Sequence, residues 1–351
     1  MKKKLFLQTF GWPLSPIRWT SRQRDHGLSG IGGGTGTSFI SKPYRLAILI
    51  LSVFFLGMPQ DCSWGQSIEH QTTVDGVNRK YYVYVPQHIS QKELYPLIVV
   101  LHGGGGNHRH AERISGMSQQ AEKRGFVIAY PDGSGRLESM LTWNANHCCG
   151  HALQLGTKDV LFIGKMIDQI AVDYPVDRSR IYVTGMSNGA MLTYQIGIAL
   201  SNKIAAIAPV VGAMFGDESR PAEAIPVVIF NGVDDRHVPF DGGYSTVERV
   251  ERNMDKPYQT AMVAFDFWAS TNGCQNSPQV ERIGNVERIS AQGCPEGAEV
   301  ILYKLHGAGH AWPGGEKGSR WGDEPTHDIS ATDVMIDFFM RHPKPFAKLN
   351  K

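Results

Sequence analysis

A serine near the middle of the chain has the surroundings of an activated nucleophile. Residues 185–189 read Gly-Met-Ser-Asn-Gly. An apolar run at residues 181–184 predicts a strand before this segment, and residues 190–200 predict a helix after it. Small residues on either side let such a strand-to-helix turn close, and the helix N-terminus favours negative charge beside the hydroxyl. Because the chain has 39 glycines, the pattern could arise by accident, so Ser187 is a candidate nucleophile on the strength of its predicted strand and helix.

A serine hydroxyl is a weak nucleophile at neutral pH, so it needs a histidine base and a carboxylate that orients the histidine. In α/β-hydrolases the acid follows the serine along the chain, and the histidine follows the acid. Asp234 and Asp235 come just after one predicted strand, and His306 and His310 come just after another. The residues alone leave open which aspartate and which histidine take part, because one of each pair could only cap a turn.

A run of glycines supplies the fourth catalytic element. Residues 102–106, His-Gly-Gly-Gly-Gly, follow a buried strand predicted at residues 97–101. Backbone N–H groups in such a run are not covered by side chains, so we expect one of them, together with the amide of Asn188, to form an oxyanion hole. A phosphate-binding loop is the rival interpretation, but no Gly-Lys-Ser/Thr ending follows and no acidic residue is placed as a dinucleotide site requires.

These residues require a scaffold, and the pattern after residue 65 predicts one. Short apolar strands alternate with helical runs, which is typical of an α/β protein with a mostly parallel sheet. We expect one domain over residues 66–351, with long functional loops at residues 131–158 and 236–258. The expected strands are residues 81–85, 97–101, 126–130, 181–184, 206–211, 227–230 and 300–305, and the expected helices are residues 160–172, 190–200, 261–269 and one from a capping Ser330 through Phe339.

Residues 1–65 predict a leader that contains a signal peptide. Residues 46–58 are apolar and uncharged, and Lys42 and Arg45 precede them. This stretch is shorter than the roughly 20 residues that span a bilayer, but it suits a signal h-region. We expect cleavage before Gln66, a secreted or periplasmic mature protein, and contact with the membrane only through the signal. The polar first 40 residues are expected to be unstructured.

Basic charge is concentrated in that leader. The whole chain has a net charge of +2, but residues 1–65 hold 8 Lys and Arg against 2 acids, which leaves 27 basic and 31 acidic residues in the rest. Nucleic-acid binding depends on Lys and Arg that neutralise phosphates, so a mildly acidic domain predicts no nucleic-acid partner.

The cysteine count agrees with export. Cleavage after residue 65 removes Cys62 and leaves four cysteines, an even number. Cys274 and Cys294 flank a polar, glycine-rich segment and are expected to form a disulfide. Cys148 and Cys149 are adjacent, and both a vicinal bridge and a pair of buried thiols remain open.

The order of these motifs resembles a known family. It is similar to the secreted polyhydroxybutyrate depolymerases and feruloyl esterase-like α/β-hydrolases that are grouped with carbohydrate esterase family 1. The resemblance spans residues 79 to 340, nearly all of the expected mature chain. It is carried by residues 79–86 (RKYYVYVP), 101–106 (LHGGGG), 130–133 (YPDG), 142–144 (TWN), 148–150 (CCG), 185–189 (GMSNG), 231–239 (NGVDDRHVP) and 307–315 (GAGHAWPGG).

The resemblance implies roles for the residues that spacing left ambiguous. The family pattern H-G-x-x-D-x-x-V-P selects Asp235 as the acid, and the pattern G-H-x-W-P selects His310 as the base. Gly104 matches the position of the oxyanion loop, where many depolymerases carry Cys, which weighs against polyester specificity and leaves the general esterase expectation intact. Asn231 stands where the family usually has His.

The expected function is therefore that of a secreted serine esterase. Ser187 would attack the ester carbonyl, His310 would accept and then deliver its proton, and Asp235 would orient the imidazole. The expected substrates are carboxylic esters, either polyhydroxyalkanoates or feruloyl or acetyl esters of polysaccharides, and no cofactor is required.

Two alternatives come from other functional classes. Residues 147–149 with His151, and His108 with His110, contain zinc-ligand types, which would suit a zinc-dependent hydrolase. Neither cluster has C-x-x-C or H-E-x-x-H spacing, so no metal site is predicted. The other alternative is a non-catalytic carbohydrate-binding protein with a hydrolase fold, against which the complete set of catalytic elements argues.

Four aromatic residues are expected near the mouth of the site. They are Trp143, Phe240, Tyr244 and Trp312. Trp143 and Trp312 are the candidate substrate-binding residues, since exposed aromatic rings suit aryl or sugar stacking. Packing is an equally good expectation for any one of them.

Overall fold

The computed structural model describes residues 67–90, 92–320 and 322–344. The expected leader, its h-region and the cleavage site before Gln66 lie outside the described residues, so they remain predictions. Within the described ranges, no helix combines the length and the apolar character needed to cross a bilayer.

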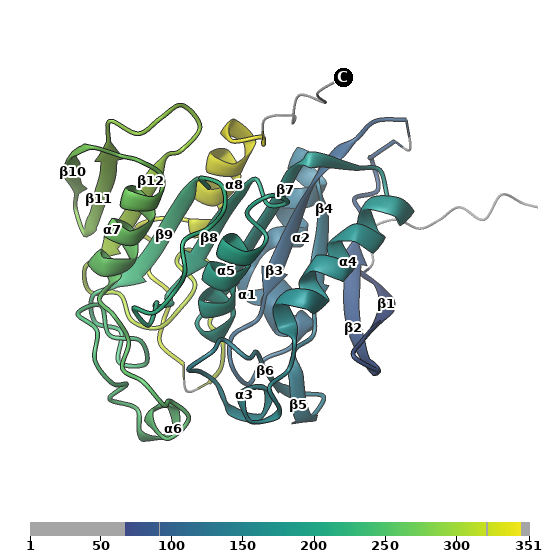
Figure 1. The fold of residues 1–351 in the computed structure, drawn as a ribbon, viewed down its shortest axis with the longest axis horizontal. Helices are drawn as coiled ribbons and strands as arrows, with labels where there is room; N and C mark the ends of the chain where they lie inside the picture. Colours follow the sequence, from purple (N-terminus) through teal and green to yellow (C-terminus); the bar gives the residue numbers. More distant parts are fainter. Residues whose placement is uncertain (1–66, 91, 321, 345–351) are drawn as a thin grey trace, which may run out of the picture. The chain divides into compact units, whose positions relative to one another are not determined.

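A sheet of ten strands forms the centre of the fold (Figure 1). Its order is β1-β2-β4-β3-β7-β8-β9-β12-β11-β10. Neighbours from β4 to β12 in this order run parallel, and the two outer strands at each edge pair antiparallel. The strands are β1 Ser67–Val74, β2 Val77–Tyr84, β3 Tyr95–Leu101, β4 Val127–Pro131, β7 Val176–Met186, β8 Ala206–Val210, β9 Val227–Gly232, β10 Asn276–Ile283, β11 Val286–Gln292 and β12 Val300–Leu305, and a separate hairpin consists of β5 Ser134–Leu137 and β6 Met140–Thr142.

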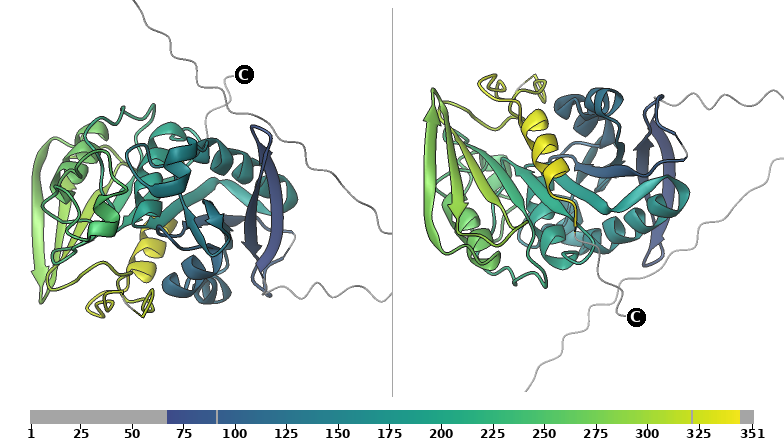
Figure 2. Two further views of the ribbon diagram at one scale, coloured as in Figure 1. Left: turned by 90° about the horizontal axis from the view of Figure 1, so that it is seen from below. Right: turned by 90° about the horizontal axis from the view of Figure 1, so that it is seen from above.

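Helices cover both faces of the sheet, which makes three layers (Figure 2). The helices α4, α5 and α7 pack on one face, and α1, α2 and α8 pack on the other. Their bounds are α1 His108–Ser115, α2 Met117–Arg124, α3 Gly150–Leu155, α4 Asp159–Asp173, α5 Asn188–Ala199, α6 Glu248–Glu251, α7 Ala261–Thr271 and α8 Ala331–Arg341.

Strand β3 shows why a continuous apolar run becomes a central strand. Successive side chains of a strand point to opposite faces. Leu97 and Val99 therefore pack in the core beneath α4 and α5, whereas Ile98 and Val100 pack in the core beneath α1 and α8. All four are fully buried, because a parallel strand covered by helices on both sides has no solvent-facing side.

The α/β fold predicted from the sequence is confirmed. All seven expected strands and all four expected helices are present, with ends within a few residues of the expected ones. The side chain of Ser330 caps α8 by accepting a hydrogen bond from the N–H of Asp333. The expectation did not include β1, β5, β6, β10, β11 or the short helices α1, α2, α3 and α6. Every residue of β10 is exposed, so that strand lacks the alternation of buried and exposed residues that reveals a strand.

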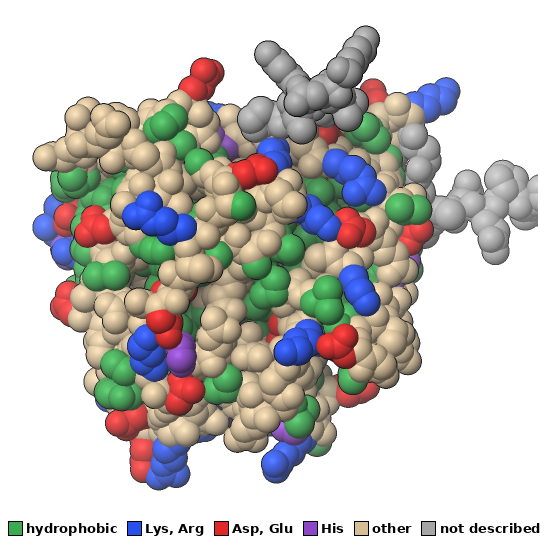
Figure 3. Space-filling view, in the orientation of Figure 1, with side chains coloured by type: hydrophobic (Ala, Val, Ile, Leu, Met, Phe, Trp, Pro, Cys, Tyr) green, Lys and Arg blue, Asp and Glu red, His purple; other side chains and the backbone are tan. Residues whose placement is uncertain are grey.

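The surface over α4, α5 and α7 is mixed in charge. Figure 3 shows that face, where Lys and Arg side chains lie beside Asp and Glu side chains in many places and hydrophobic side chains form small separate groups. The face therefore presents no broad area of a single charge.

The direction of the parallel strands determines where polar groups gather. Ligands of open α/β sheets bind beyond the carboxyl ends of the strands. Strands β3, β7, β9 and β12 all end at the same edge, and the loops that follow them begin at His102, Ser187, Val233 and His306. The segments that the sequence identifies as catalytic therefore meet at one edge of the sheet.

Candidate active site

The turn between β7 and α5 holds Ser187 in an unusual backbone conformation. Its φ is 57° and its ψ is −121°, a region that side chains rarely adopt and that is often found at functional sites. The close approach of the chain explains the two flanking glycines. A Cβ at Gly185 would lie 2.7 Å from the backbone of Gly189, and a Cβ at Gly189 would lie 2.5 Å from the carbonyl oxygen of His102.

Three side chains from distant parts of the sequence form one hydrogen-bonded chain. The Nε2 atom of His310 lies 2.9 Å from Oγ of Ser187, and its Nδ1 atom lies 2.7 Å from Oδ2 of Asp235. A carboxylate only accepts, so Nδ1 carries the proton and Nε2 is free to accept the serine hydroxyl proton. This is the arrangement that general-base activation of serine requires.

The carboxylate of Asp235 is buried and held in place by its own loop. Its Oδ1 atom accepts hydrogen bonds from the backbone N–H groups of His237 and Val238, at 2.8 and 2.9 Å. This leaves Oδ2 for the imidazole of His310. Both carboxylate oxygens of Asp235 thus have hydrogen-bond partners, which fix the direction in which the carboxylate faces His310.

The other members of the two ambiguous pairs lie elsewhere. Asp234 is exposed to solvent. His306 forms a hydrogen bond with Glu287 at 2.9 Å, away from the serine. The structure therefore brings Asp235 and His310 to Ser187, and not their sequence neighbours.

Two further residues support the histidine and were not identified from the sequence. Oδ2 of Asp323 accepts the backbone N–H of His310 at 2.6 Å. The ring of His237 stacks on the ring of His310, with centroids 4.6 Å apart and planes 19° apart. Burial, followed by the charge of His310, lowers the pKa of His237. His237 lies within the motif at residues 231–239, so its place in the sequence could have identified it. No sequence pattern identifies Asp323.

The glycine loop lies against the nucleophile turn. A Cβ placed at Gly103 would lie 3.5 Å from Cβ of Ser187, and one at Gly104 would lie 3.6 Å from Cβ of Asn188. The N–H of Gly104 makes no hydrogen bond with a described residue, and the first N–H groups of a helix, here that of Asn188, have no partner within the helix. Two backbone donors are thus available beside the serine.

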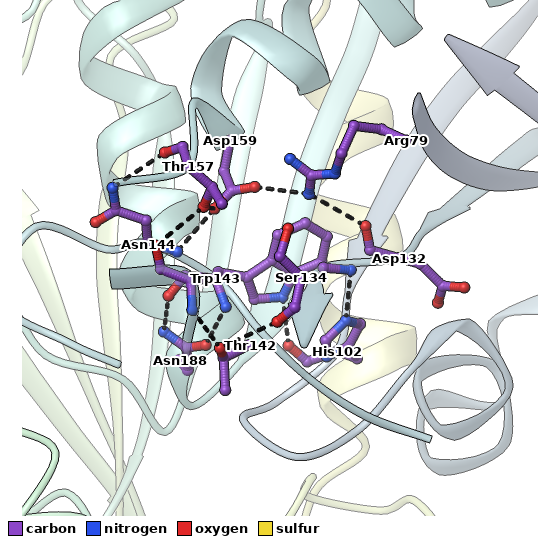
Figure 4. Close-up of polar contacts among 12 residues, drawn as sticks. Arg79, His102, Asp132, Ser134, Thr142, Trp143, Asn144, Thr157, Asp159 and Asn188 are labelled. Atoms are coloured by element: carbon purple, nitrogen blue, oxygen red, sulfur yellow. Dashed lines mark hydrogen bonds and ion pairs between the residues drawn. The ribbon is translucent and has the colours of Figure 1, made fainter. Parts of the chain in front are cut away.

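Trp143 fixes this pair of segments to each other (Figure 4). Its backbone N–H donates to Oδ1 of Asn188 at 2.7 Å, and its carbonyl accepts from Nδ2 of the same residue at 3.0 Å. Its indole N–H donates to the carbonyl of His102 at 2.9 Å. The side chain is 0% exposed, so it has no face to offer a substrate. The expectation that Trp143 binds substrate therefore needs correction, because its hydrogen bonds join the glycine loop to the start of α5 instead.

His102 anchors the other side of the loop. Its Nδ1 atom lies 2.8 Å from the carbonyl of Gly103, and its Nε2 atom lies 3.0 Å from the backbone nitrogen of Gly133. The carbonyl accepts and the amide donates, so both contacts are satisfied by the neutral imidazole with its proton on Nδ1. Burial lowers the pKa of His102 to about 4, which keeps this neutral form at physiological pH.

A buried ion pair closes the network that Figure 4 shows. A guanidinium nitrogen of Arg79 lies 2.7 Å from a carboxylate oxygen of Asp159, and both side chains are almost fully buried. Arg79 also donates to the carbonyl of Asp132, and Asp159 accepts the backbone N–H of Asn144. The pair therefore ties the segments on both sides of Trp143 to strand β2.

The remaining aromatic candidates differ in exposure. Trp312 is 1% exposed and donates its indole N–H to Oγ1 of Thr332 at 2.9 Å, so the expectation that it binds substrate also needs correction, since it packs against α8. Phe240 is buried, whereas Tyr244 is 50% exposed. Of the four, Tyr244 alone presents a large part of its ring to solvent.

The four cysteines in the described part of the chain pair as two disulfides. Cys274 and Cys294 are joined with an S–S distance of 2.01 Å, as the sequence predicted. Cys148 and Cys149 are joined in a vicinal disulfide, which was one of the two alternatives left open.

Three of the four histidines of the zinc alternative have other partners, whereas Nδ1 of His151 has none among the described residues. Both ring nitrogens of His147 contact carboxylates, those of Asp255 and Asp217. His108 contacts the carboxylate of Asp132, and His110 contacts a backbone carbonyl.

Comparisons with known proteins point in the same direction as the site. The family model described as esterase PHB depolymerase matches residues 79–241. Feruloyl esterase B of Piromyces equi is 30% identical over 245 residues, which cover 68% of this chain and 44% of that protein. The bifunctional acetylxylan esterase/xylanase XynS20E of Neocallimastix patriciarum is 28% identical over 236 residues, which cover 67% of this chain and 31% of that protein. The chain thus spans less than half the length of these two relatives.

Solved structures show the same fold. The acetyl xylan esterase from Aspergillus awamori superposes with a TM-score of 0.54 at 17% identity, covering 78% of this chain and 99% of that one. At this identity the likeness establishes the fold alone. The chain therefore has an α/β-hydrolase fold, and in sequence it is similar to proteins named as polyhydroxybutyrate depolymerase, feruloyl esterase and acetylxylan esterase.

Proposed function

We propose that the protein is a serine esterase in which Ser187, His310 and Asp235 are the catalytic residues. The observation that carries the proposal is the continuous hydrogen-bonded chain from serine to histidine to buried carboxylate, beside two available backbone amides. The family match and the names of the relatives support ester hydrolysis.

The geometry suits a two-step acyl transfer. His310 removes the hydroxyl proton of Ser187 as the oxygen attacks the ester carbonyl, and the imidazolium that forms is stabilised by Asp235. The amides of Gly104 and Asn188 would stabilise the negative oxygen of the tetrahedral intermediate. His310 then protonates the departing alcohol, after which a water molecule repeats the sequence on the acyl-enzyme and releases the acid.

We propose ester groups on plant polysaccharides as the substrate class. Two relatives are named for feruloyl and acetylxylan esters, and so is the Aspergillus structure. Polyhydroxyalkanoate is the second candidate, because the family model carries the depolymerase name. The signal-like residues 46–58 support action outside the cytoplasm, where such polymers occur, in a secreted or periplasmic protein.

The test of the catalytic proposal is Ser187→Ala, with Ser277→Ala on the exposed strand β10 as the matched control. Hydrolysis of p-nitrophenyl acetate by Ser187→Ala should fall at least about a thousandfold, whereas the control should keep the parent rate. A fluorophosphonate probe should label the parent and the control but not Ser187→Ala. A folded Ser187→Ala protein that keeps most of its activity would refute the proposal. A parent that is not labelled would favour the non-catalytic binding alternative.

The substrate class needs a separate measurement. Release of product from methyl ferulate, acetylated xylan and polyhydroxybutyrate should be compared in parallel with purified protein. The proposal expects the two carbohydrate-type esters to be hydrolysed faster than the polyester. The opposite ranking would assign the protein to the depolymerases.

A further inference from the structure

A large cavity lies beside the oxyanion loop and contains none of the three triad residues. Its volume is about 880 Å³. It lies between the turn that joins β1 to β2, the β5–β6 hairpin, the start of α1 and the segment between α3 and α4. Arg79, Asp132, Ser134 and Thr157, which Figure 4 labels, belong to its lining. We call it the hairpin cavity.

The hairpin cavity shares a wall with the oxyanion loop. Leu141 lines the cavity, its N–H donates to the carbonyl of Gly106, and its carbonyl accepts from the N–H of Gly105. Strand β4, which ends at the cavity, lies two strands from β7, which ends at the nucleophile. Two strand spacings are about 10 Å. Gly104 and Gly105 are exposed between them, so a chain bound at Ser187 can continue over these glycines into the cavity.

Three cations line the hairpin cavity without an ionic partner. The side chains of Arg109, Arg136 and Lys158 are exposed, and they form no ion pair or hydrogen bond with any described residue. They come from three different segments: Arg109 lies in α1, Arg136 lies in β5, and Lys158 directly precedes α4. The tertiary structure therefore gathers positive charge that the mildly acidic sequence does not reveal.

The cavity has three acidic residues in its lining. Glu138 forms an ion pair with Lys80, and the carboxylate of Asp132 accepts a hydrogen bond from the backbone N–H of His108 at 2.8 Å. Asp75, on the turn between β1 and β2, has no cationic partner among the residues described. The three cations without an ionic partner therefore outnumber the two acids, Asp75 and Asp132, that have no Lys or Arg partner among the described residues.

The lining also offers surfaces for the nonpolar side of a sugar. The ring of Tyr82 stacks on that of His108 with centroids 3.5 Å apart, and both rings line the cavity. Leu141 and Leu155 add aliphatic surface. Aromatic and aliphatic walls with a few placed polar groups are typical of a site for a small organic ligand.

We propose that the hairpin cavity is a subsite for an acidic sugar residue, a uronic acid, in the chain that bears the ester. The proposal rests on the proposed esterase function and names its preferred substrate as an acidic polysaccharide. Arg109, Arg136 and Lys158 would bind the carboxylate, because charge-assisted hydrogen bonds between guanidinium and carboxylate are strong and directional. A neutral polyester has no group that these cations would select.

Binding is tested first, in a form that does not depend on turnover. The Ser187→Ala protein is titrated calorimetrically with a xylo-oligosaccharide that carries one glucuronic acid branch and with the unbranched neutral oligosaccharide. The acidic ligand should bind about tenfold or more tightly, the scale of one charge-assisted hydrogen bond. Its advantage should shrink in 1 M salt, where the screening length falls to about 3 Å. Equal affinity for the two ligands would overturn the subsite proposal even if the protein is an esterase.

Steady-state kinetics of variants then test whether the preference for the acidic substrate depends on the cations of the hairpin cavity. In the parent background, Arg109→Gln and Arg136→Gln should each lower kcat/KM about tenfold on an acetylated oligosaccharide with the uronic acid branch, mainly through KM, and leave p-nitrophenyl acetate hydrolysis unchanged. Arg282→Gln, on β10 at the other end of the sheet, is the matched control and should change neither. Equal losses on acidic and neutral esters would overturn the proposal. A parent protein that binds the acidic ligand but hydrolyses no ester would retain the subsite and refute the esterase function.

Discussion

Acidification should destabilise the folded protein through His102. This side chain is fully buried, and its two nitrogens contact the carbonyl of Gly103 and the N–H of Gly133. Protonation of Nε2 would place a second N–H against the donor of Gly133 and would put a charge where no water can solvate it. Burial accordingly lowers the pKa of His102 from 6.5 to about 4.

The sign and size of the effect follow from proton linkage. Between pH 6.5 and pH 4, the unfolded chain binds a proton at this position that the folded protein does not bind. Stability therefore falls as the pH falls through this window. Above pH 6.5 the group has no effect, because it is neutral in both states. By pH 4.5 the expected loss is about 2.5 kcal/mol, which is a large part of the roughly 5 to 15 kcal/mol that stabilises a typical domain.

Urea unfolding of the parent protein and of His102→Gln, at pH 7 and at pH 4.5, measures this contribution. The variant should be less stable at pH 7, by about 1 to 3 kcal/mol for the disturbed hydrogen bonds. Its further loss between the two pH values should be about 2.5 kcal/mol smaller than that of the parent. Other titrating groups affect both proteins alike and cancel in the comparison. The same loss in both proteins would refute the argument.

A second measurement covers the case in which His102→Gln does not fold. The imidazole of His102 in the parent protein can be followed by NMR as the pH is lowered. Its resonances should show no protonation above about pH 5. A midpoint near 6.5 in the folded protein would contradict the neutral anchor.

Other predictions concern packing and covalent links. Trp312→Phe should leave KM for esters unchanged and lower stability, as read by kinetics and urea unfolding, and a raised KM with unchanged stability would restore its role in substrate binding. Cys274→Ala should lower stability by about 3 kcal/mol, because the disulfide to Cys294 restricts the unfolded chain; unfolding at equal urea midpoints would contradict this. Gly189→Ala would place a methyl group 2.5 Å from the carbonyl oxygen of His102, so p-nitrophenyl acetate hydrolysis should fall at least about a hundredfold, and a near-normal rate would show that the turn can relax.

Local sequence pattern was sufficient to predict the central strands and the longer helices of this protein. Central strands such as β3 are continuous apolar runs because both faces are covered, and helix α8 begins at a serine whose side chain caps it. The candidate nucleophile could be identified for the same reason, since the turn at Ser187 depends on small residues close to it in sequence. The edge strand β10 could not be found, because all of its residues are exposed and it carries no periodic signal.

Only the tertiary structure decided which distant side chains meet. The spacing of the motifs along the chain did not distinguish Asp234 from Asp235. In the folded protein the carboxylate of Asp235 contacts His310, whereas Asp234 is exposed to solvent. The sequence also could not show that Trp143 lies inside the fold as a brace, since the same residue type serves exposed and buried sites. The three unpaired cations of the hairpin cavity are also far apart in the sequence, so only the fold shows that they line one cavity. Burial and convergence are properties of the packed chain, whereas the sequence by itself determines only what neighbours within a few residues can do.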